Sequence, residues 1–364
     1  VNKDLTDTHW FTSKTMAFMM PTIMMIMNGL SLAIYWIGAV LINDAQDMQG
    51  KFTLFSDMVV FSSYAMQVVM SFMMLVMIFI MLPRASVAAK RILEVLDTEP
   101  SIEDGTRDTF PVMKDGEVEF KDVSFKYPDA EEYVLEHISF SAKKGETIAF
   151  IGATGCGKST AINLIPRFYD ATEGEVFVDG VNVKEYTQEA LHNKIGYVSQ
   201  KAILFSGTIA DNVAYGENGK APATQDDIAM AVKVAQASEF VEKKDQGYDG
   251  YVAQGGSNFS GGQKQRLSIA RAIARQPEIL IFDDSFSALD YKTDRILREA
   301  LRKECKDATK IIVAQRIGTI RDADKIIVLD DGQIAGMGTH DELMKNCEVY
   351  QEIAYSQLSK EELA

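Results

Sequence analysis

A glycine-rich segment, GATGCGKS from Gly152 to Ser159, has residue types suited to holding phosphate. A strand-like run, TIAFI, precedes it, and an apolar helical stretch follows, the context that this pattern requires. Glycines let the backbone curl so that its N–H groups point at phosphate, at the positive end of the new helix. Lys158 adds a cation at the β- and γ-phosphates, and the Ser159 hydroxyl can ligate Mg²⁺. The candidate contact residues are Gly152, Thr154, Gly155, Cys156, Gly157, Lys158, Ser159 and Thr160.

A second chemical signal is the run ILIFDD, an apolar strand that ends in two carboxylates, Asp283 and Asp284. After a phosphate-binding loop, the first carboxylate is expected to bind Mg²⁺ and the second to handle water. The two segments together predict a site for a nucleotide and Mg²⁺, with Ser159 and Asp283 as metal ligands.

Composition narrows the classes of partner and the compartment. The formal net charge is −15, nearly all of it after Asp97, which argues against binding nucleic acid. The three cysteines, Cys156, Cys305 and Cys347, are odd in number and widely spaced, which suits a reducing cytosol rather than disulfides. Cys156 lies among amides that would raise its reactivity, but a small residue that fits the loop is the favoured interpretation over a redox role.

Two uncharged apolar runs, residues 16–42 and 58–82, each predict a helix that spans a membrane. The first has 27 residues and would extend roughly 40 Å. The link between them, 43–53, is mainly acidic, whereas Arg84, Lys90 and Arg91 closely follow the second run, so both chain ends are expected in the cytoplasm. The first run is too long for a cleavable signal peptide.

Some residues inside the apolar runs leave alternatives open. Asn28, Gly29 and Gln67 would face protein or water, and helix packing is favoured over the lining of a substrate pathway. Fourteen of the 18 methionines precede Pro83. Their flexible thioethers could form an adaptable apolar surface, but contact with membrane lipid explains them equally well.

The next motif, NFSGGQKQR from Asn258 to Arg266, resembles the signature sequence of ATP-binding cassette (ABC) proteins. Other motifs of that family stand in order along the chain. Tyr127 resembles the aromatic that stacks on adenine, and Gln200 the glutamine that senses Mg²⁺ and water. SALD, ending at Asp290, resembles the loop that signals between two cassettes. The resemblance implies that ATP and Mg²⁺ are the cofactors, with Ser159, Gln200 and Asp283 as metal-binding residues.

The resemblance also implies the fold and the domains. It predicts an α-helical transmembrane segment followed by an α/β nucleotide-binding domain: a P-loop core around Ile148, Leu280 and Ile312, an antiparallel part near Glu117 to Phe140, and a helical subdomain from about Thr208 to Gln276. The expected domains are a partial transmembrane domain at 1–97, a linker at 98–114, the ABC domain at 115–358 and a tail at 359–364.

In this family two cassettes face each other, and each ATP lies between the phosphate loop of one and the signature of the other. Residues Ser260, Gly261, Gly262 and Gln263 would therefore contact a partner's nucleotide. The membrane part resembles the last two of six helices in an exporter half-transporter. Two helices cannot enclose a pathway, and the chain begins at Val1, so it is interpreted as a fragment of a longer protein without its four upstream helices.

Two departures from the family pattern bear on hydrolysis. The family places Glu where this chain has Asp284, and His where it has Gln315. Asp reaches about 1.5 Å less far, which matters when proton transfer needs hydrogen-bond distance. Gln carries no charge and shuttles no proton. We therefore predict a degenerate site, similar to the non-hydrolysing half of heterodimeric bacterial multidrug exporters, whose partner subunit carries the catalytic Glu and His.

The leading hypothesis is thus a multi-pass subunit of a bacterial cell membrane that drives the export of amphiphilic or drug-like molecules, with its ATP-binding domain in the cytoplasm. A membrane-anchored ATP-binding regulator that gates a partner without pumping is the alternative. A soluble cassette of the kind found in repair or translation is disfavoured by the two spanning runs. Drugs, lipids and peptides all stay open as cargo, since fold does not determine cargo.

Overall fold

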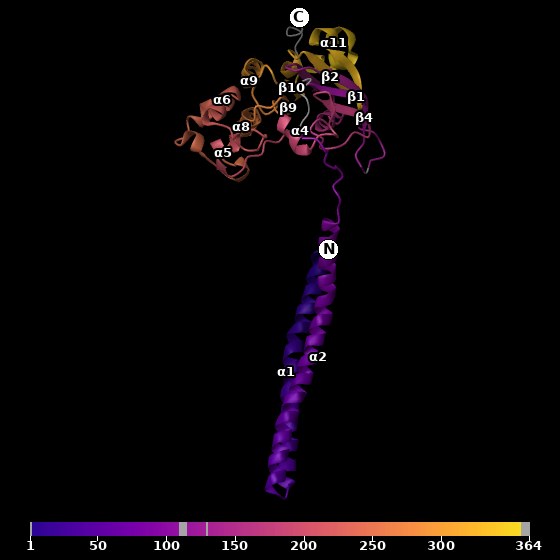
Figure 1. Cartoon of the computed structure of the whole chain (residues 1–364), viewed down its shortest axis with the longest axis vertical. Coiled ribbons are helices and arrows are strands. Elements are labelled where there is room, and N and C mark those ends of the chain that lie inside the picture. Colours follow the sequence, from indigo (N-terminus) through magenta and orange to yellow (C-terminus); the bar gives the residue numbers. More distant parts are fainter. Residues whose placement is uncertain (1, 109–114, 129, 358–364) are drawn as a thin grey trace. The chain divides into compact units, whose positions relative to one another are not determined.

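The computed structural model describes residues 2–108, 115–128 and 130–357 (Figure 1). The chain divides after Pro100 into two compact units, and each is described separately below. Part of the expected linker, 109–114, and the whole expected tail, 359–364, lie outside the described residues.

The first unit consists of two helices, α1 (Asn2–Asp44) and α2 (Met48–Leu96), which pack against each other (Figure 1). Both are long and apolar enough to cross a membrane. Both are also longer than the uncharged runs, and the expected link at 43–53 is reduced to residues 45–47. Backbone hydrogen bonding carries a helix into its polar flanks, and the Asp47 side chain caps α2 by accepting from the Gly50 N–H at 3.0 Å. Pro83 lies inside α2, and the helix continues past it through Arg84 to Leu96.

The second unit contains two main sheets. The antiparallel sheet has the order β2-β1-β4-β5. Its strands are β1 (Val118–Phe125), β2 (Leu135–Ala142), β4 (Glu173–Val178) and β5 (Val181–Asn182). The first two strands confirm the antiparallel part predicted from the sequence. The last two were not predicted, because their short polar run shows little of the alternation that marks a strand.

The larger sheet has the order β12-β11-β3-β10-β9-β6, and every neighbouring pair is parallel except β11 with β12. Its strands are β3 (Thr147–Ile151), β6 (Ile195–Val198), β9 (Ile279–Asp283), β10 (Thr309–Val313), β11 (Lys325–Asp330) and β12 (Gln333–Gly338). Ile148, Leu280 and Ile312 lie buried on three of these strands, which confirms the predicted core. Strands buried on both faces read as nearly continuous apolar runs, as these do.

Ten α-helices are described in the second unit. They are α3 (Lys158–Asn163), α4 (Gln188–Lys194), α5 (Ile209–Val213), α6 (Gln225–Val234), α7 (Ser238–Val241), α8 (Gly261–Ala274), α9 (Tyr291–Glu304), α10 (Ile317–Ile320), α11 (His340–Asn346) and α12 (Glu348–Gln357). The predicted helical subdomain corresponds to α5 through α8, together with a small β7 (Gly207–Thr208) and β8 (Tyr251–Val252) pair that was not predicted. Leu267, Ala270 and Ile273 place one face of α8 in the core.

An ion cluster joins the two main sheets. The Lys194 ammonium, at the end of α4, lies 2.8 Å from Asp179, which follows β4, and 2.7 Å from Glu278, which precedes β9. Asp179 also accepts the Glu117 N–H at 3.1 Å. Burial alone would lower the pKa of Lys194, but the hydrogen bonds to both carboxylates raise it above its ordinary value. The lysine therefore stays charged and holds the strand ends of both sheets together.

Replacing Lys194 should leave the carboxylates of Asp179 and Glu278 without their cation. We expect Lys194→Met to lower the free energy of unfolding by about 2–3 kcal/mol, towards the lower end for a broken buried pair, because Glu278 is partly exposed. Pulse proteolysis of the full chain in detergent, over a urea series, measures the shift. Lys184→Met, at an exposed lysine in the same region, is the matched control. Equal urea midpoints for the two variants would contradict the stabilising role of Lys194.

Candidate nucleotide-binding site

The phosphate loop joins the buried strand β3 to helix α3. Gly157 precedes the helix with φ of 97°, and a Cβ there would lie 2.9 Å from the Val134 carbonyl oxygen. A side chain at Gly152 would collide with the Leu329 carbonyl. Glycine is therefore required at both ends of the loop, by left-handed backbone at one end and by close backbone approach at the other.

The Lys158 side chain folds back over the loop. Its ammonium donates to the carbonyl oxygens of Gly152 at 2.9 Å and Ala153 at 2.6 Å, and it lies 3.5 Å from the Cys156 sulfur. Cys156 is buried beside it, which fits a small residue that fills the loop. Thr154 and Gly155 are exposed at the loop tip. The loop thus holds one cation against its own backbone carbonyl oxygens, where the cation is at hand for a phosphate chain.

An aromatic group borders the loop. The Tyr127 hydroxyl lies 3.1 Å from the Thr160 hydroxyl, directly after the loop. Its ring meets Phe125 edge-on at 5.0 Å and Tyr169 edge-on at 5.2 Å. The structure therefore brings Tyr127 to the phosphate loop and adds Tyr169, which sequence reasoning missed because no motif marks that position.

Two of the three expected metal ligands also meet, whereas the third, Gln200, donates to Asp284. The Ser159 hydroxyl donates to one oxygen of Asp283 at 2.7 Å, although 124 positions separate the two residues. The Tyr197 hydroxyl lies 3.4 Å from the other oxygen and donates to the Asn163 side-chain oxygen, Oδ1, at 2.9 Å. Burial, and then the charge of Asp283, raise the pKa of Tyr197, so its proton stays available for donation. Tyr197 is a second residue that the motifs did not reveal.

This pair of oxygen donors fits Mg²⁺. A hydroxyl and a carboxylate are hard ligands, and Mg²⁺ commonly takes one or two protein ligands together with substrate phosphates. Within the described residues, no group of three His, Cys, Asp or Glu could hold a metal without such help. Ser159 and Asp283 would hold the ion together with phosphates of a bound nucleotide.

Asp284 lies between two glutamines. One of its oxygens accepts from the Gln315 amide at 2.9 Å and from the Gln200 amide at 3.3 Å. Its backbone has φ of 44°, and its N–H donates to the Val313 carbonyl oxygen, which orients the side chain at the sheet edge. Burial raises the pKa of Asp284 above its ordinary value, while the hydrogen bond from Gln200 opposes the shift. The structure thus brings together the two positions that depart from the family pattern.

The signature residues form a separate group. Ser260 precedes α8, and its hydroxyl accepts the Gln263 N–H at 3.3 Å while the Gln263 side chain accepts the Ser260 N–H at 2.9 Å. Gly261 is exposed at the first turn, and Gly262 follows it. Asp290 caps α9 in the same manner by accepting the Thr293 N–H at 3.0 Å. Within the described parts of the chain, no hydrogen bond links these residues to the phosphate loop.

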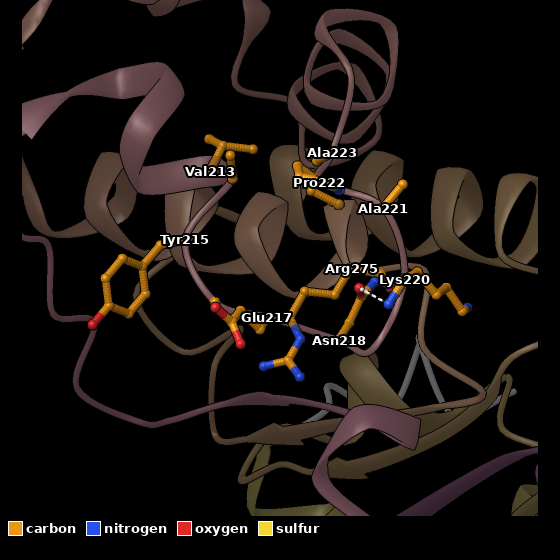
Figure 2. Close-up of a pocket in the computed structure, with 12 residues that line it drawn as sticks. Val213, Tyr215, Glu217, Asn218, Lys220, Ala221, Pro222, Ala223 and Arg275 are labelled. Carbon is orange, nitrogen blue, oxygen red and sulfur yellow. Dashed lines mark hydrogen bonds between the residues drawn. The ribbon is translucent and has the colours of Figure 1, made fainter. Parts of the chain in front are cut away.

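A pocket of about 460 Å³ lies elsewhere, between the end of α8 and residues 213–223 (Figure 2). Asn218 donates to the Arg275 carbonyl oxygen at 2.7 Å, so this loop caps the end of α8. The pocket contains none of the residues that the motifs singled out, and we assign it no part in nucleotide binding.

Comparisons with known proteins agree with this geometry. A family model described as ABC transporter matches residues 135–287. An ABC transporter ATP-binding protein of Mycobacterium tuberculosis is 44% identical over 94% of this chain and 57% of its own length. The ATP-dependent lipid A-core flippase of Haemophilus influenzae is 42% identical over 76% of this chain and 46% of its own. The chain thus spans about half the length of the curated relatives that it matches.

One solved structure is similar over most of the chain. A bacterial Atm1-family ABC exporter with ATP bound superposes with a TM-score of 0.75 and 32% sequence identity. The match covers 92% of this chain and 58% of that protein. It shows an N-terminal helical region joined to an ABC nucleotide-binding domain.

Tyr197 offers a test of the metal position. Removing its hydroxyl in Tyr197→Phe frees one oxygen of Asp283, so we expect Mg²⁺-dependent ATP affinity to fall about fivefold, as for one hydrogen bond, with little change in EDTA. Titration with a fluorescent ATP analogue measures the affinity with Mg²⁺ and the affinity in EDTA. Tyr133→Phe, whose hydroxyl donates to the exposed Glu173, is the control. Equal losses with and without Mg²⁺ would contradict the role.

Proposed function

Because this chain contains the ATP-binding domain of an ABC transporter within an exporter-type fold, we propose that it is a half-transporter subunit specialised for holding ATP. Its phosphate loop, Tyr127 and Asp283 bind Mg²⁺-ATP, whereas hydrolysis at its own site is slow. Its signature completes the catalytic site of a different partner subunit, which supplies the Glu and the His. The two together form a heterodimer.

The observation that carries this proposal is the setting of Asp284. Two neutral amides, from Gln200 and Gln315, donate to one and the same oxygen of its carboxylate. These two hydrogen bonds occupy the two lone pairs of that oxygen, so only the other carboxylate oxygen can meet water. That oxygen stands on a side chain about 1.5 Å shorter than Glu, and neither glutamine can take up a proton. The centre therefore orients water but has a less direct route for its proton.

The signature supports the asymmetric pairing. The capping box between Ser260 and Gln263 fixes the first turn of α8, a helix of 14 residues. A side chain at Gly261 would meet nothing within 4 Å, so a phosphate can approach the amides there closely. The groups that serve a partner's ATP are intact, while those that hydrolyse this chain's own ATP are altered.

We propose that α1 and α2 correspond to the last two of the six membrane-spanning helices in an exporter half-transporter. The other four helices would belong to a longer protein of which this chain is a part. α1 and α2 both pass the length and hydropathy criteria for a span. Their faces are rich in Met and other apolar side chains, which suits lipid contact and amphiphilic cargo. The similarity to a lipid flippase favours the same class of cargo. The setting proposed is a bacterial cell membrane, with the ATP-binding domain in the cytoplasm.

The degenerate centre can be tested by restoring the family residues. A pair of identical chains carrying Asp284→Glu and Gln315→His would have complete sites on both sides, because the signature is intact. We expect ATPase activity at least about tenfold above that of the unaltered chain, since a positioned general base contributes 10²–10⁴-fold. Phosphate release, measured over rising chain concentration in detergent, gives the rate and its dependence on pairing.

Two controls make that result decisive. Gly261→Glu in the same background places a carboxylate at the signature of each partner and should abolish the gain, while the exposed position tolerates the change. High ATPase activity of the unaltered chain alone, insensitive to Gly261→Glu, would contradict both the slow site and the need for a partner.

Export is tested separately. Inside-out vesicles that contain the full heterodimer should accumulate a fluorescent amphiphile when ATP is added, and vesicles with Lys158→Met in this chain should accumulate much less, since its ammonium could no longer bind phosphate. Uptake is measured by filtration, with AMP as the nucleotide control. ATP binding without uptake of any amphiphile would support the membrane-anchored regulator instead.

A further inference from the structure

The last described helix, α12, ends against the loop that carries Gln315. Tyr350 and Ala354 bury one face of α12 in the core, and Gln357 follows at the same helical spacing. The Tyr350 hydroxyl lies 2.7 Å from a ring nitrogen of the buried His340, which anchors that face to α11. Core packing therefore holds the helix that carries Gln357, while the Gln357 side chain itself is exposed.

The Gln357 amide makes two hydrogen bonds to that loop. Its nitrogen donates to the Gln315 carbonyl oxygen at 2.7 Å, and its oxygen accepts the Ile317 N–H at 3.0 Å. Helix α10 begins at Ile317, and Arg316, the residue before it, provides no side-chain cap. The first N–H groups of a helix need an outside acceptor. The Gln357 side-chain oxygen is such an acceptor for the Ile317 N–H, although Gln357 lies 40 positions further along the chain.

The same loop is held on its other side. The Arg316 guanidinium donates to the carbonyl oxygens of Leu289 and Ser287, each at 3.1 Å, in the segment between Asp284 and α9. The backbone at 315–317 is thus fixed by Arg316 on one side and by Gln357 on the other. Between these two anchors, the Gln315 side chain reaches Asp284 at 2.9 Å.

We propose that Gln357 is a positioning residue: by holding the backbone on both sides of residue 316, it aims the side chain at position 315 towards residue 284. The inference rests on the proposed function, in which residues 284 and 315 face the attacking water. The two bonds use the backbone only, so they act whether position 315 is Gln or His. Helix α12 is thereby tied to the candidate hydrolytic centre.

The direct test is hydrogen exchange of the full chain in detergent. Gln357→Met keeps the length of the side chain and removes both hydrogen bonds, so the Ile317 amide should exchange about three- to tenfold faster, as expected for one lost hydrogen bond. Gln351→Met is the matched control: the same change on the same helix, at an amide that donates to the Met344 carbonyl oxygen. Unchanged exchange at Ile317 in Gln357→Met would overturn the proposal.

The functional test uses the chain with Asp284→Glu and Gln315→His. Adding Gln357→Met should lower kcat about three- to tenfold and leave KM for ATP unchanged, because the phosphate loop is untouched. Gln351→Met should change neither. Equal kcat values, or a loss confined to KM, would overturn the positioning role. If that background itself hydrolyses no ATP, the proposed function fails, and exchange at Ile317 still decides whether Gln357 holds the loop.

Discussion

The candidate site depends on the parallel pairing of β3, β10, β9 and β6. In parallel strands the carboxyl ends lie at one edge of the sheet, which is where open α/β sheets bind their ligands. Here the register places Val313 of β10 opposite both Phe150 of β3 and Asp283 of β9. The phosphate loop, the two carboxylates and the glutamine loops all follow these strands, so the pairing alone brings residues more than 100 positions apart into hydrogen-bond distance.

The parts of the site that could be predicted from the sequence are those that one continuous segment builds. The phosphate loop needs only a strand, its glycines and a helix. Strand β9 has its carboxylates at its own carboxyl end, with Asp283 as its last residue and Asp284 directly after it. The existence of α1 and α2 could likewise be predicted, because an uncharged run is a local property. Their bounds could not: a cap at Asp47 and backbone hydrogen bonding extend both helices well beyond the apolar residues.

The residues that sequence reasoning missed share the opposite property. In the sequence, Tyr169 looks like an ordinary surface aromatic and Tyr197 like an aromatic on a strand. Gln357 looks like a polar residue at the end of a helix. Each acquires its role from a partner that is distant in the sequence. Lys194 is similar, since its two carboxylates flank strands of different sheets. Such contacts arise from the topology, which single-segment patterns do not encode.

Binding and hydrolysis are physically separable in this architecture. The groups that bind phosphate are backbone amides and one lysine at a rigid junction of strand and helix, so changes elsewhere leave them intact. The groups proposed to handle water are side chains on loops, where proton transfer depends on hydrogen-bond reach and on a group that can take up the proton. Helix α8 links the two: its N-terminus carries the signature, and its Gln265 donates to the Ser199 carbonyl oxygen, beside Gln200. Under the proposed function, a partner's nucleotide at that N-terminus would act on a helix that also contacts the loop of Gln200 in this chain.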